Sequence, residues 1–131
     1  MGAQLITVGE LMGRGEAAPS VGADATIAQA IAEMSAKSWY GGTAVVDASG
    51  RLIGAFTDGD LRRSVGRADP SSKVRDYMAV SPMSVGPEVV ASEAMRIMNE
   101  RERPIMLMFV CEDGRLVGAV HMHDFLRAGI A

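Results

Sequence analysis

Cysteine is nearly absent from this sequence of 131 residues, which contains only Cys111. A single cysteine excludes a disulfide bond within the chain and is compatible with a reducing compartment. The sequence also lacks an apolar run as long as a membrane span, and its N-terminus lacks a basic region followed by an apolar core. We therefore predict a cytoplasmic protein that does not enter a membrane. Cys111 lies in a strand-like apolar run, which favours a buried structural thiol over a nucleophile.

An excess of positive charge is also missing. The 13 Lys and Arg residues are outnumbered by 16 Asp and Glu residues, and the formal net charge is −3. This balance argues against a general nucleic-acid-binding protein. Eleven of the 13 basic residues are arginine, however, and the planar fork of arginine suits phosphate, so local oxyanion binding stays open. Hydrophobic residues make up 48% and charged residues 22% of the chain, which indicates a folded globular protein.

The sequence shows no constellation that is typical of an enzyme. It contains no evident nucleophile–base pair and no Gly-rich phosphate loop of the Walker type. His121-Met122-His123 would place two imidazoles on one face of a strand, but no cysteine is nearby and Asp124 is the only adjacent carboxylate. We therefore predict no catalysis, no metal site and no required cofactor for this chain alone.

An internal repeat organises the sequence. Gly50-Arg51-Leu52-Ile53-Gly54 returns 64 residues later as Gly114-Arg115-Leu116-Val117-Gly118, and Asp60 returns as Asp124 at the same offset. We predict a first repeat at residues 1–66, a polar linker at 67–73 and a second repeat at 74–131. About 60 residues are too few for a robust core, so the repeats should pack together. The chain begins and ends almost directly on this pattern, which indicates a piece of a longer protein.

Each repeat has the pattern of a β-α-β-β-α unit, so the predicted fold class is α+β. A brief strand at 20–21 or 84–85 precedes an amphipathic helix. A hairpin follows, with strands at 43–47 and 52–57 or at 106–110 and 116–121, and then a short helix at 60–65 or 124–128. The predicted apolar helix faces are Ile27, Ala30, Ile31 and Met34 in the first repeat and Ala91, Ala94, Met95 and Met98 in the second. Thr26 with Gln29 predicts a capping box. We expect the units to pack sheet to sheet about a pseudo-two-fold axis, with clefts between them.

Polar residues mark the point where the second hairpin strand meets the short helix. In Thr57-Asp58-Gly59-Asp60, the Asp60 carboxylate could accept hydrogen bonds from two ribose hydroxyls, and Thr57 could donate one to a phosphate oxygen. The alternative is that Asp58 or Asp60 simply caps the helix. The recurrence of the whole unit favours a ligand site.

These features together resemble the cystathionine β-synthase (CBS) domain pair, also called a Bateman module. The strings Phe56-Thr57-Asp58-Gly59-Asp60-Leu61-Arg62-Arg63 and His121-Met122-His123-Asp124-Phe125-Leu126-Arg127-Ala128-Gly129 resemble the C-terminal CBS pair of bacterial arabinose-5-phosphate isomerases. Such isomerases carry an N-terminal sugar-isomerase domain that interconverts ribulose 5-phosphate and arabinose 5-phosphate. Arabinose 5-phosphate supplies 3-deoxy-octulosonate (Kdo) for lipopolysaccharide. That domain is absent from this sequence, so the resemblance implies regulation.

The resemblance also implies where a ligand binds, because CBS pairs generally hold nucleotides between their repeats. Thr57 and Asp60 match the residues that hold phosphate and ribose, while Gly42, Thr43 and Ala44 match backbone contacts to the base. In the second repeat His121 replaces the hydroxyl residue, and Met106 and Leu107 replace Gly42 and Thr43, so we expect one good site or two unequal ones. The candidate ligand-binding residues are Val21, Thr26, Gly42, Thr43, Ala44, Thr57, Asp58, Asp60, Arg62, Ile105, His121, His123 and Asp124.

Several partners follow from these expectations. AMP or ATP is the conservative choice of ligand, and CMP-Kdo, the activated end product, is the sharper one. The carboxylate of CMP-Kdo would suit Arg62, Arg63 or Arg127, and His121 and His123 could donate to it. A module that dimerises without any ligand is the alternative of a different class. Apolar helices on a small unit predict a homo-oligomer, either a dimer or a tetramer. Trp39-Tyr40 could stack on a base or pack the hairpin.

Overall fold

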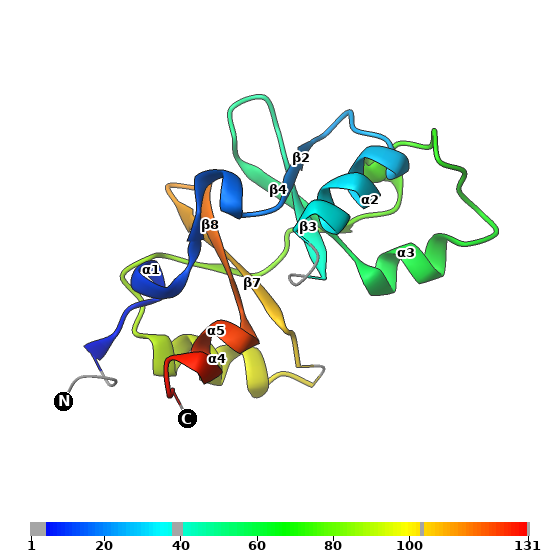
Figure 1. Ribbon diagram of the computed structural model, residues 1–131. Coiled ribbons are helices and arrows are strands. Elements are labelled where there is room, and N and C mark those ends of the chain that lie inside the picture. The colour runs from blue at the N-terminus through cyan, green and yellow to red at the C-terminus, as the bar shows by residue number, and fades with distance from the viewer. Residues whose placement is uncertain (1–4, 38–40, 103, 131) are drawn as a thin grey trace.

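Two four-stranded sheets and five α-helices form the part of the chain that the computed structural model describes, residues 5–37, 41–102 and 104–130 (Figure 1). One sheet has the strand order β2 (Ser20–Gly22), β3 (Gly42–Val46), β4 (Leu52–Thr57) and β5 (Ala79–Val80). The other has the order β1 (Gly13–Arg14), β8 (Arg115–His121), β7 (Leu107–Glu112) and β6 (Ser84–Val85). The helices are α1 (Val8–Leu11), α2 (Ile27–Ala36), α3 (Asp58–Ser64), α4 (Ala91–Asn99) and α5 (Met122–Arg127), with short 3-10 turns at Gly15–Ala17 and Val74–Asp76. The predicted α+β class is confirmed, and no helix of the described ranges is long and apolar enough to span a bilayer.

The long helices α2 and α4 follow the predicted apolar spacing with one exception. Ala91, Ala94, Met95 and Met98 of α4 are all buried. In α2, Ile27, Ala30 and Met34 are buried, but Ile31, which is predicted to lie on the same apolar face, is 36% exposed. The buried stripe of α2 is narrower than the predicted one, and Ile31 lies at its edge. The capping box is confirmed, since Thr26 Oγ1 accepts from Gln29 N and Thr26 N donates to Gln29 Oε1.

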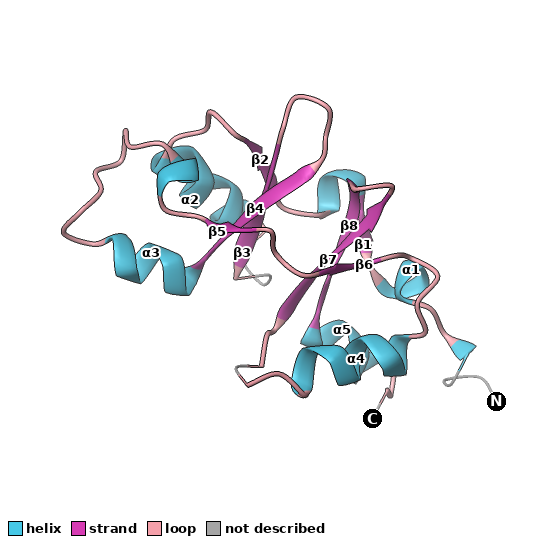
Figure 2. Cartoon of the chain, turned by 180° about the vertical axis from the view of Figure 1, so that it is seen from behind, coloured by secondary structure: helices cyan, strands magenta, loops and turns pink. Residues whose placement is uncertain are grey.

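The opening strand of each repeat belongs to the sheet of the other repeat. β1 pairs with β8 in an antiparallel ladder, and β5 pairs with β4 in the same way. The buried Val8 and Met12 lie in the core of the second repeat, and the buried Val74 lies in the core of the first. Figure 1 accordingly shows α1 beside α4 and α5, while Figure 2 shows the segment between β5 and β6 running from one lobe to the other. The sequence pattern does not predict this exchange.

Glycine allows the exchanged segments to pack closely. A Cβ atom added at Gly54 in β4 would lie less than 3.0 Å from the sulfur of Met78, and one added at Gly118 in β8 would lie less than 3.0 Å from the sulfur of Met12. Met78 precedes β5 and Met12 precedes β1, so each methionine comes with the exchanged strand. The recurring glycines and methionines of the sequence therefore face one another across the exchange.

A pseudo-two-fold axis relates the repeats where their hairpins meet. Arg51 and Arg115, which are equivalent in the repeat, form a β-bridge with each other. Two equivalent hydrogen bonds flank it, from Leu52 N to the Gly114 oxygen and from Leu116 N to the Gly50 oxygen, each 3.0 Å long. Behind them lies a shared core of Ala18, Ala44, Ala55, Phe109 and Ala119. The prediction that the repeats pack through their sheets is confirmed.

The hairpin registers correct the predicted alignment of the repeats. Gly42 lies opposite Thr57, and Leu107 lies opposite His121, so Leu107 is the equivalent of Gly42 and Met108 that of Thr43. The prediction that Met106 and Leu107 replace Gly42 and Thr43 is therefore wrong by one residue. The reason is the turn of the second hairpin, which is one residue shorter. It uses Asp113 and Gly114 with φ of 52° and 81°, values suited to a type I′ turn.

Candidate functional site

The predicted site of the first repeat is a capping box at the end of β4. Thr57 is the N-cap of α3: its Oγ1 accepts from Asp60 N at 3.4 Å, and its own N donates to Asp60 Oδ2 at 2.9 Å. Asp60 is only 9% exposed. The alternative that Asp58 or Asp60 is the cap is wrong in its residue, because Thr57 is the N-cap of α3 and Asp60 is its N3 partner in the capping box. Asp58 is exposed and lies between these two residues in the chain.

An arginine also bonds to the Asp60 carboxylate at the end of β4. Arg63, one turn after Asp60 on α3, donates from Nη2 to Asp60 Oδ1 at 2.6 Å, and Thr57 Oγ1 donates to Asp60 Oδ2 at 3.1 Å. The predicted ligand residue on this helix, Arg62, is exposed and forms no ion pair within the described ranges. Its neighbour Arg63 therefore contacts the predicted ribose-binding carboxylate. The spacing of three residues between Asp60 and Arg63 is the sequence signal for this pair.

The second repeat reproduces this arrangement with histidine as the cap. His121 N donates to Asp124 Oδ2 at 2.7 Å, and Arg127 Nη2 donates to Asp124 Oδ1 at 2.6 Å. His121 Nδ1 accepts a 3.1 Å hydrogen bond from His123 N, in the place of a hydroxyl oxygen. Asp124 and His121 are both buried, at 8% and 7% exposure. The two strand ends are thus equivalent in geometry and differ in the capping side chain.

His121 is held as a neutral ring. Its imidazole stacks on that of His123, with centroids 4.7 Å apart and planes at 15°. Burial lowers the pKa of His121, and the nearby His123 and Arg127 lower it further, against the opposing effect of Asp124. Because Nδ1 accepts a hydrogen bond, the proton of the neutral ring is assigned to Nε2. His121 can therefore donate to a ligand through Nε2, but the protonated form that would donate more strongly is disfavoured.

The residues predicted to contact a base lie in β3 and are already packed. Gly42, Thr43 and Ala44 are buried, and Thr43 Oγ1 donates to the Ala44 oxygen at 3.0 Å. Ala44 N donates to the Pro19 oxygen. The Leu107 side chain from the second repeat fills the space at Gly42, where an added Cβ would lie 3.3 Å from Leu107 Cδ2. A base could enter here only if Leu107 moved.

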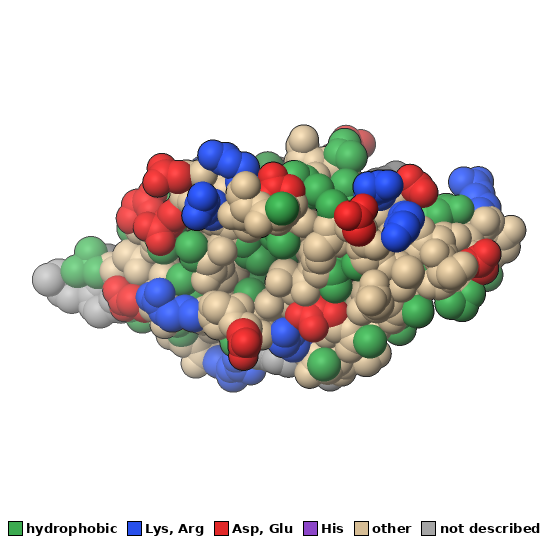
Figure 3. Space-filling view, turned by 90° about the horizontal axis from the view of Figure 1, so that it is seen from above, with side chains coloured by type: hydrophobic (Ala, Val, Ile, Leu, Met, Phe, Trp, Pro, Cys, Tyr) green, Lys and Arg blue, Asp and Glu red, His purple; other side chains and the backbone are tan. Residues whose placement is uncertain are grey.

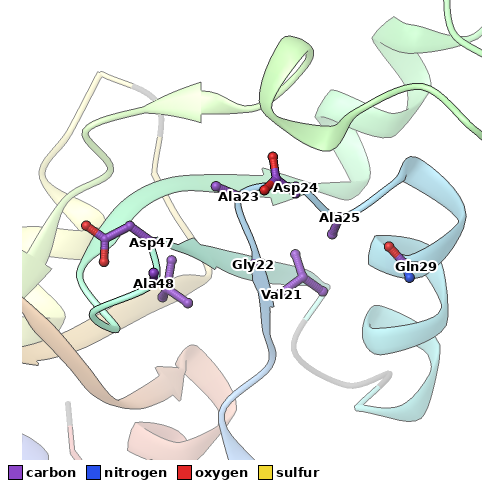
Figure 4. Close-up of a pocket in the computed structure, with 9 residues that line it drawn as sticks. Val21, Gly22, Ala23, Asp24, Ala25, Gln29, Asp47 and Ala48 are labelled. Carbon is purple, nitrogen blue, oxygen red and sulfur yellow. The ribbon is translucent and has the colours of Figure 1, made fainter.

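Two cavities in the described part of the chain are each lined by a predicted site residue. A cavity of about 530 Å³ lies where β2 and β3 end and α2 begins (Figure 4). It is lined by Val21, Gly22, Ala23, Asp24, Ala25, Gln29, Val46, Asp47 and Ala48. Asp58 lines a smaller one of about 190 Å³ between α2 and α3. Thr57 and Asp60 line neither of these two cavities.

The remaining predicted residues belong to other elements. Thr26 serves as the cap of α2, and Ile105 is half-buried against the core of the second repeat. His123 is exposed beside His121. Trp39 and Tyr40 lie outside the described residues. Burial raises the pKa of the Cys111 thiol, which fits the predicted structural role. No group of three His, Cys, Asp or Glu side chains suited to a metal ion occurs in the described part of the chain.

Comparison with known proteins identifies the family. The CBS domain profile matches residues 8–67 and again residues 74–131. The chain belongs to the CBS domain family. Across 96% of its length this CBS pair is 38% identical to arabinose 5-phosphate isomerase KdsD of Yersinia pestis, and it spans only 38% of the length of that protein.

Solved CBS proteins share the fold. The CBS-domain protein ATU1752 of Agrobacterium tumefaciens superposes with a TM-score of 0.80 at 27% identity, over 99% of this chain and 98% of that one. CBSX2 of Arabidopsis thaliana, solved in complex with AMP, superposes with a TM-score of 0.79 at 24% identity, over 94% and 95% of the two chains.

Proposed function

We propose that this CBS pair is the regulatory, nucleotide-binding part of a D-arabinose 5-phosphate isomerase of Kdo and lipopolysaccharide biosynthesis. Its similarity to KdsD over 96% of the chain supports this origin. The chain spans 38% of that relative, and the sugar-isomerase domain would occupy another part of the parent protein. On this proposal the pair performs no chemistry itself and acts on the isomerase domain as a partner.

The observation that carries the nucleotide-binding proposal is the pair of buried carboxylates at equivalent strand ends. Asp60 and Asp124 are 9% and 8% exposed, and each lies beside a capping side chain and an arginine. Carboxylate oxygens accept hydrogen bonds from sugar hydroxyls, and guanidinium groups pair with phosphate or carboxylate. Such a combination fits a ligand that carries both a diol and an anion. The AMP complex of the similarly folded CBSX2 is consistent with this class of ligand.

Among the candidate ligands, CMP-Kdo best fits both the chemistry of the site and the pathway of the parent enzyme. It contains a ribose, a phosphate and a sugar carboxylate, and it lies downstream of the isomerase reaction. Arg62, Arg63 and Arg127 are exposed near the strand ends and could pair with its anionic groups. His121 Nε2 and His123 could donate to the sugar acid. Feedback by the end product would then control the first enzyme of the branch.

Calorimetric titration of the chain with CMP-Kdo, AMP and ATP tests this function. We expect heat of binding with each nucleotide and the tightest binding with CMP-Kdo. Tighter AMP or ATP with no response to CMP-Kdo would replace feedback control by adenine-nucleotide sensing. A ligand specific for the folded state must raise its thermal stability by mass action. If no nucleotide raises the melting temperature, the chain acts as a ligand-free dimerisation module and the proposal fails.

A further inference from the structure

Both oxygens of the Asp60 carboxylate are engaged within the chain. Oδ2 accepts from Thr57 N at 2.9 Å and from Thr57 Oγ1 at 3.1 Å, and Oδ1 accepts from Arg63 Nη2 at 2.6 Å. A carboxylate offers about four lone-pair sites, so about one remains open, on Oδ1. A vicinal diol whose two hydroxyls both donate to this carboxylate needs two acceptor sites, and only one is open. One internal donor must therefore leave, and the departure of Arg63 would open both sites of Oδ1.

Arg63 is the donor that can leave at least cost. Its side chain is 69% exposed, whereas the Asp60 side chain is only 10% exposed. An exposed ion pair within one turn of a helix contributes little stability, because solvent screens it and the long side chain loses freedom. The Thr57 backbone N–H, by contrast, belongs to the capping box that starts α3, and breaking its bond to Asp60 Oδ2 would leave a backbone donor without a partner. The ion pair should therefore open before the cap.

We propose that Arg63 is an exchange residue that makes the first site selective for ligands carrying both a diol and an anion. The diol displaces the guanidinium from Asp60, and the released guanidinium pairs with the phosphate or carboxylate of the same ligand. A neutral nucleoside supplies the diol but has no anion to pair with the released Arg63. The loss of the Arg63–Asp60 ion pair therefore weakens its binding. This inference rests on the proposed function, since it concerns the same strand-end site.

The second strand end has the same ion pair, which strengthens the argument. Arg127 contacts Asp124 Oδ1 at 2.6 Å, the distance found between Arg63 and Asp60, although the capping residue has changed from Thr57 to His121. The ion pair is thus retained at both sites while the cap differs. The equivalent exchange at Asp124 would involve Arg127.

Matched titrations with nucleosides and nucleotides test the exchange. Cytidine, CMP, adenosine and AMP are titrated into the wild-type chain, Arg63→Gln, Arg63→Lys and the control Arg67→Gln. Arg67 follows α3, is exposed and forms no ion pair within the described residues. We expect Arg63→Gln to bind the nucleosides about 1.5- to 5-fold more tightly, the range that an exposed ion pair represents. It should bind the nucleotides about 10-fold more weakly, because a charge-assisted contact to phosphate is lost.

The ratio of nucleotide to nucleoside affinity decides the outcome. Arg63→Lys keeps a positive charge and should restore part of the wild-type ratio, while Arg67→Gln should leave it unchanged. If Arg63→Gln changes nucleoside and nucleotide affinity by the same factor, the exchange is wrong but the proposed function stands. CMP-Kdo is titrated alongside the four probes: if only CMP-Kdo binds, the exchange is wrong and the proposed function stands, and if the wild-type chain binds none of the five, both proposals fail. Thermal unfolding verifies that each variant folds, and Arg63→Lys carries the test if the glutamine variant does not.

Discussion

At the residue scale, the same side chains that start a helix are those proposed to hold a ligand. Asp60 and Asp124 are buried partners of the capping residues Thr57 and His121, and each is also paired with an arginine. The two sites differ in the capping side chain, because Thr57 supplies a hydroxyl, whereas the buried His121 ring is fixed by its bond from His123 N and by stacking.

The inequality of the two sites leads to a prediction for the carboxylates. We expect Asp60→Ala to weaken CMP-Kdo binding by about 1.5–3 kcal/mol, the value of hydrogen bonds to a charged group, and Asp124→Ala to weaken it much less. Calorimetry measures both affinities. Thermal unfolding supplies the control, because each variant breaks one capping box and should lose a similar stability of about 0.5–2 kcal/mol. Equal losses of affinity would show that the two sites are equivalent.

The neutral His121 makes stability depend on pH. Its pKa in the folded state is lowered from the ordinary value of 6.5, mainly by burial. Below pH 6.5 the unfolded chain takes up a proton that folded His121 resists, so the free energy of unfolding should fall until the pH reaches the folded pKa. His121→Thr, which copies the cap of the first repeat, should remove this contribution. Urea unfolding between about pH 5 and pH 8 measures it. Identical pH profiles for the two proteins would contradict the assignment.

At the element scale, the opening strands and the hairpins depend on one another. The second strand of each hairpin carries a glycine against which a methionine from the exchanged segment packs, Met78 on Gly54 and Met12 on Gly118. The methionines of the opening patterns are therefore part of the contact that attaches β5 to β4 and β1 to β8.

A methyl group added at the glycine of this contact should destabilise the sheet. Gly54→Ala places a Cβ against the Met78 sulfur and an adjacent carbonyl, so we expect the free energy of unfolding to fall by about 1–3 kcal/mol. Denaturant unfolding measures the change. Gly22→Ala is the matched control, because nothing lies within 4 Å of a Cβ added there. Adding Met78→Ala should recover part of the loss, and an additive double variant would mean that the methionine is not the obstacle.

At the scale of the whole molecule, neither repeat forms its hydrophobic core from its own residues alone. Val8 and Met12 pack into the second repeat although they come from the first, and Val74 does the reverse. The division into repeats at residues 1–66 and 74–131 thus remains a prediction about the sequence, while each core contains residues from both repeats.

On the face shown in Figure 3, acidic and basic side chains are interspersed over the surface.

The exchange predicts that a single repeat does not fold. A fragment of residues 74–131 would lack Val8, Met12 and β1, and it would leave the edge of β8 unpaired. We expect such a fragment to show no sharp thermal transition in circular dichroism. Supplying a peptide of residues 5–14 should restore folded signal. A fragment that unfolds cooperatively by itself would contradict the shared core.

Exposed apolar side chains predict self-association. Ile31, Val65, Met106 and Leu126 are 36%, 75%, 51% and 55% exposed, and they lie on or near α2, α3 and α5. A homo-oligomer, either a dimer or a tetramer, would cover such residues. Analytical ultracentrifugation at tens of micromolar should therefore show a species larger than a monomer. A single monomeric species at that concentration would exclude the oligomer.

The sequence by itself determined the features that depend on neighbouring residues. The β-α-β-β-α unit follows from apolar periodicity, the capping box at Thr26 from a spacing of three, and the strand-end position of Thr57 and Asp60 from the repeat. These are short-range patterns, in which a residue contacts others within about one turn or one hairpin.

Only the tertiary structure decided which distant segments meet. The exchange of β1 and β5 depends on contacts between the two repeats, and the one-residue shift that brings Leu107 to Gly42 depends on the length of a hairpin turn. Whether Asp60 is free for a ligand also depends on geometry, because the Arg63 side chain could extend to solvent as easily as to the carboxylate. Short-range patterns cannot determine these choices, since each is made by the packing of segments that lie far apart in the chain or by the rotamer of one exposed side chain.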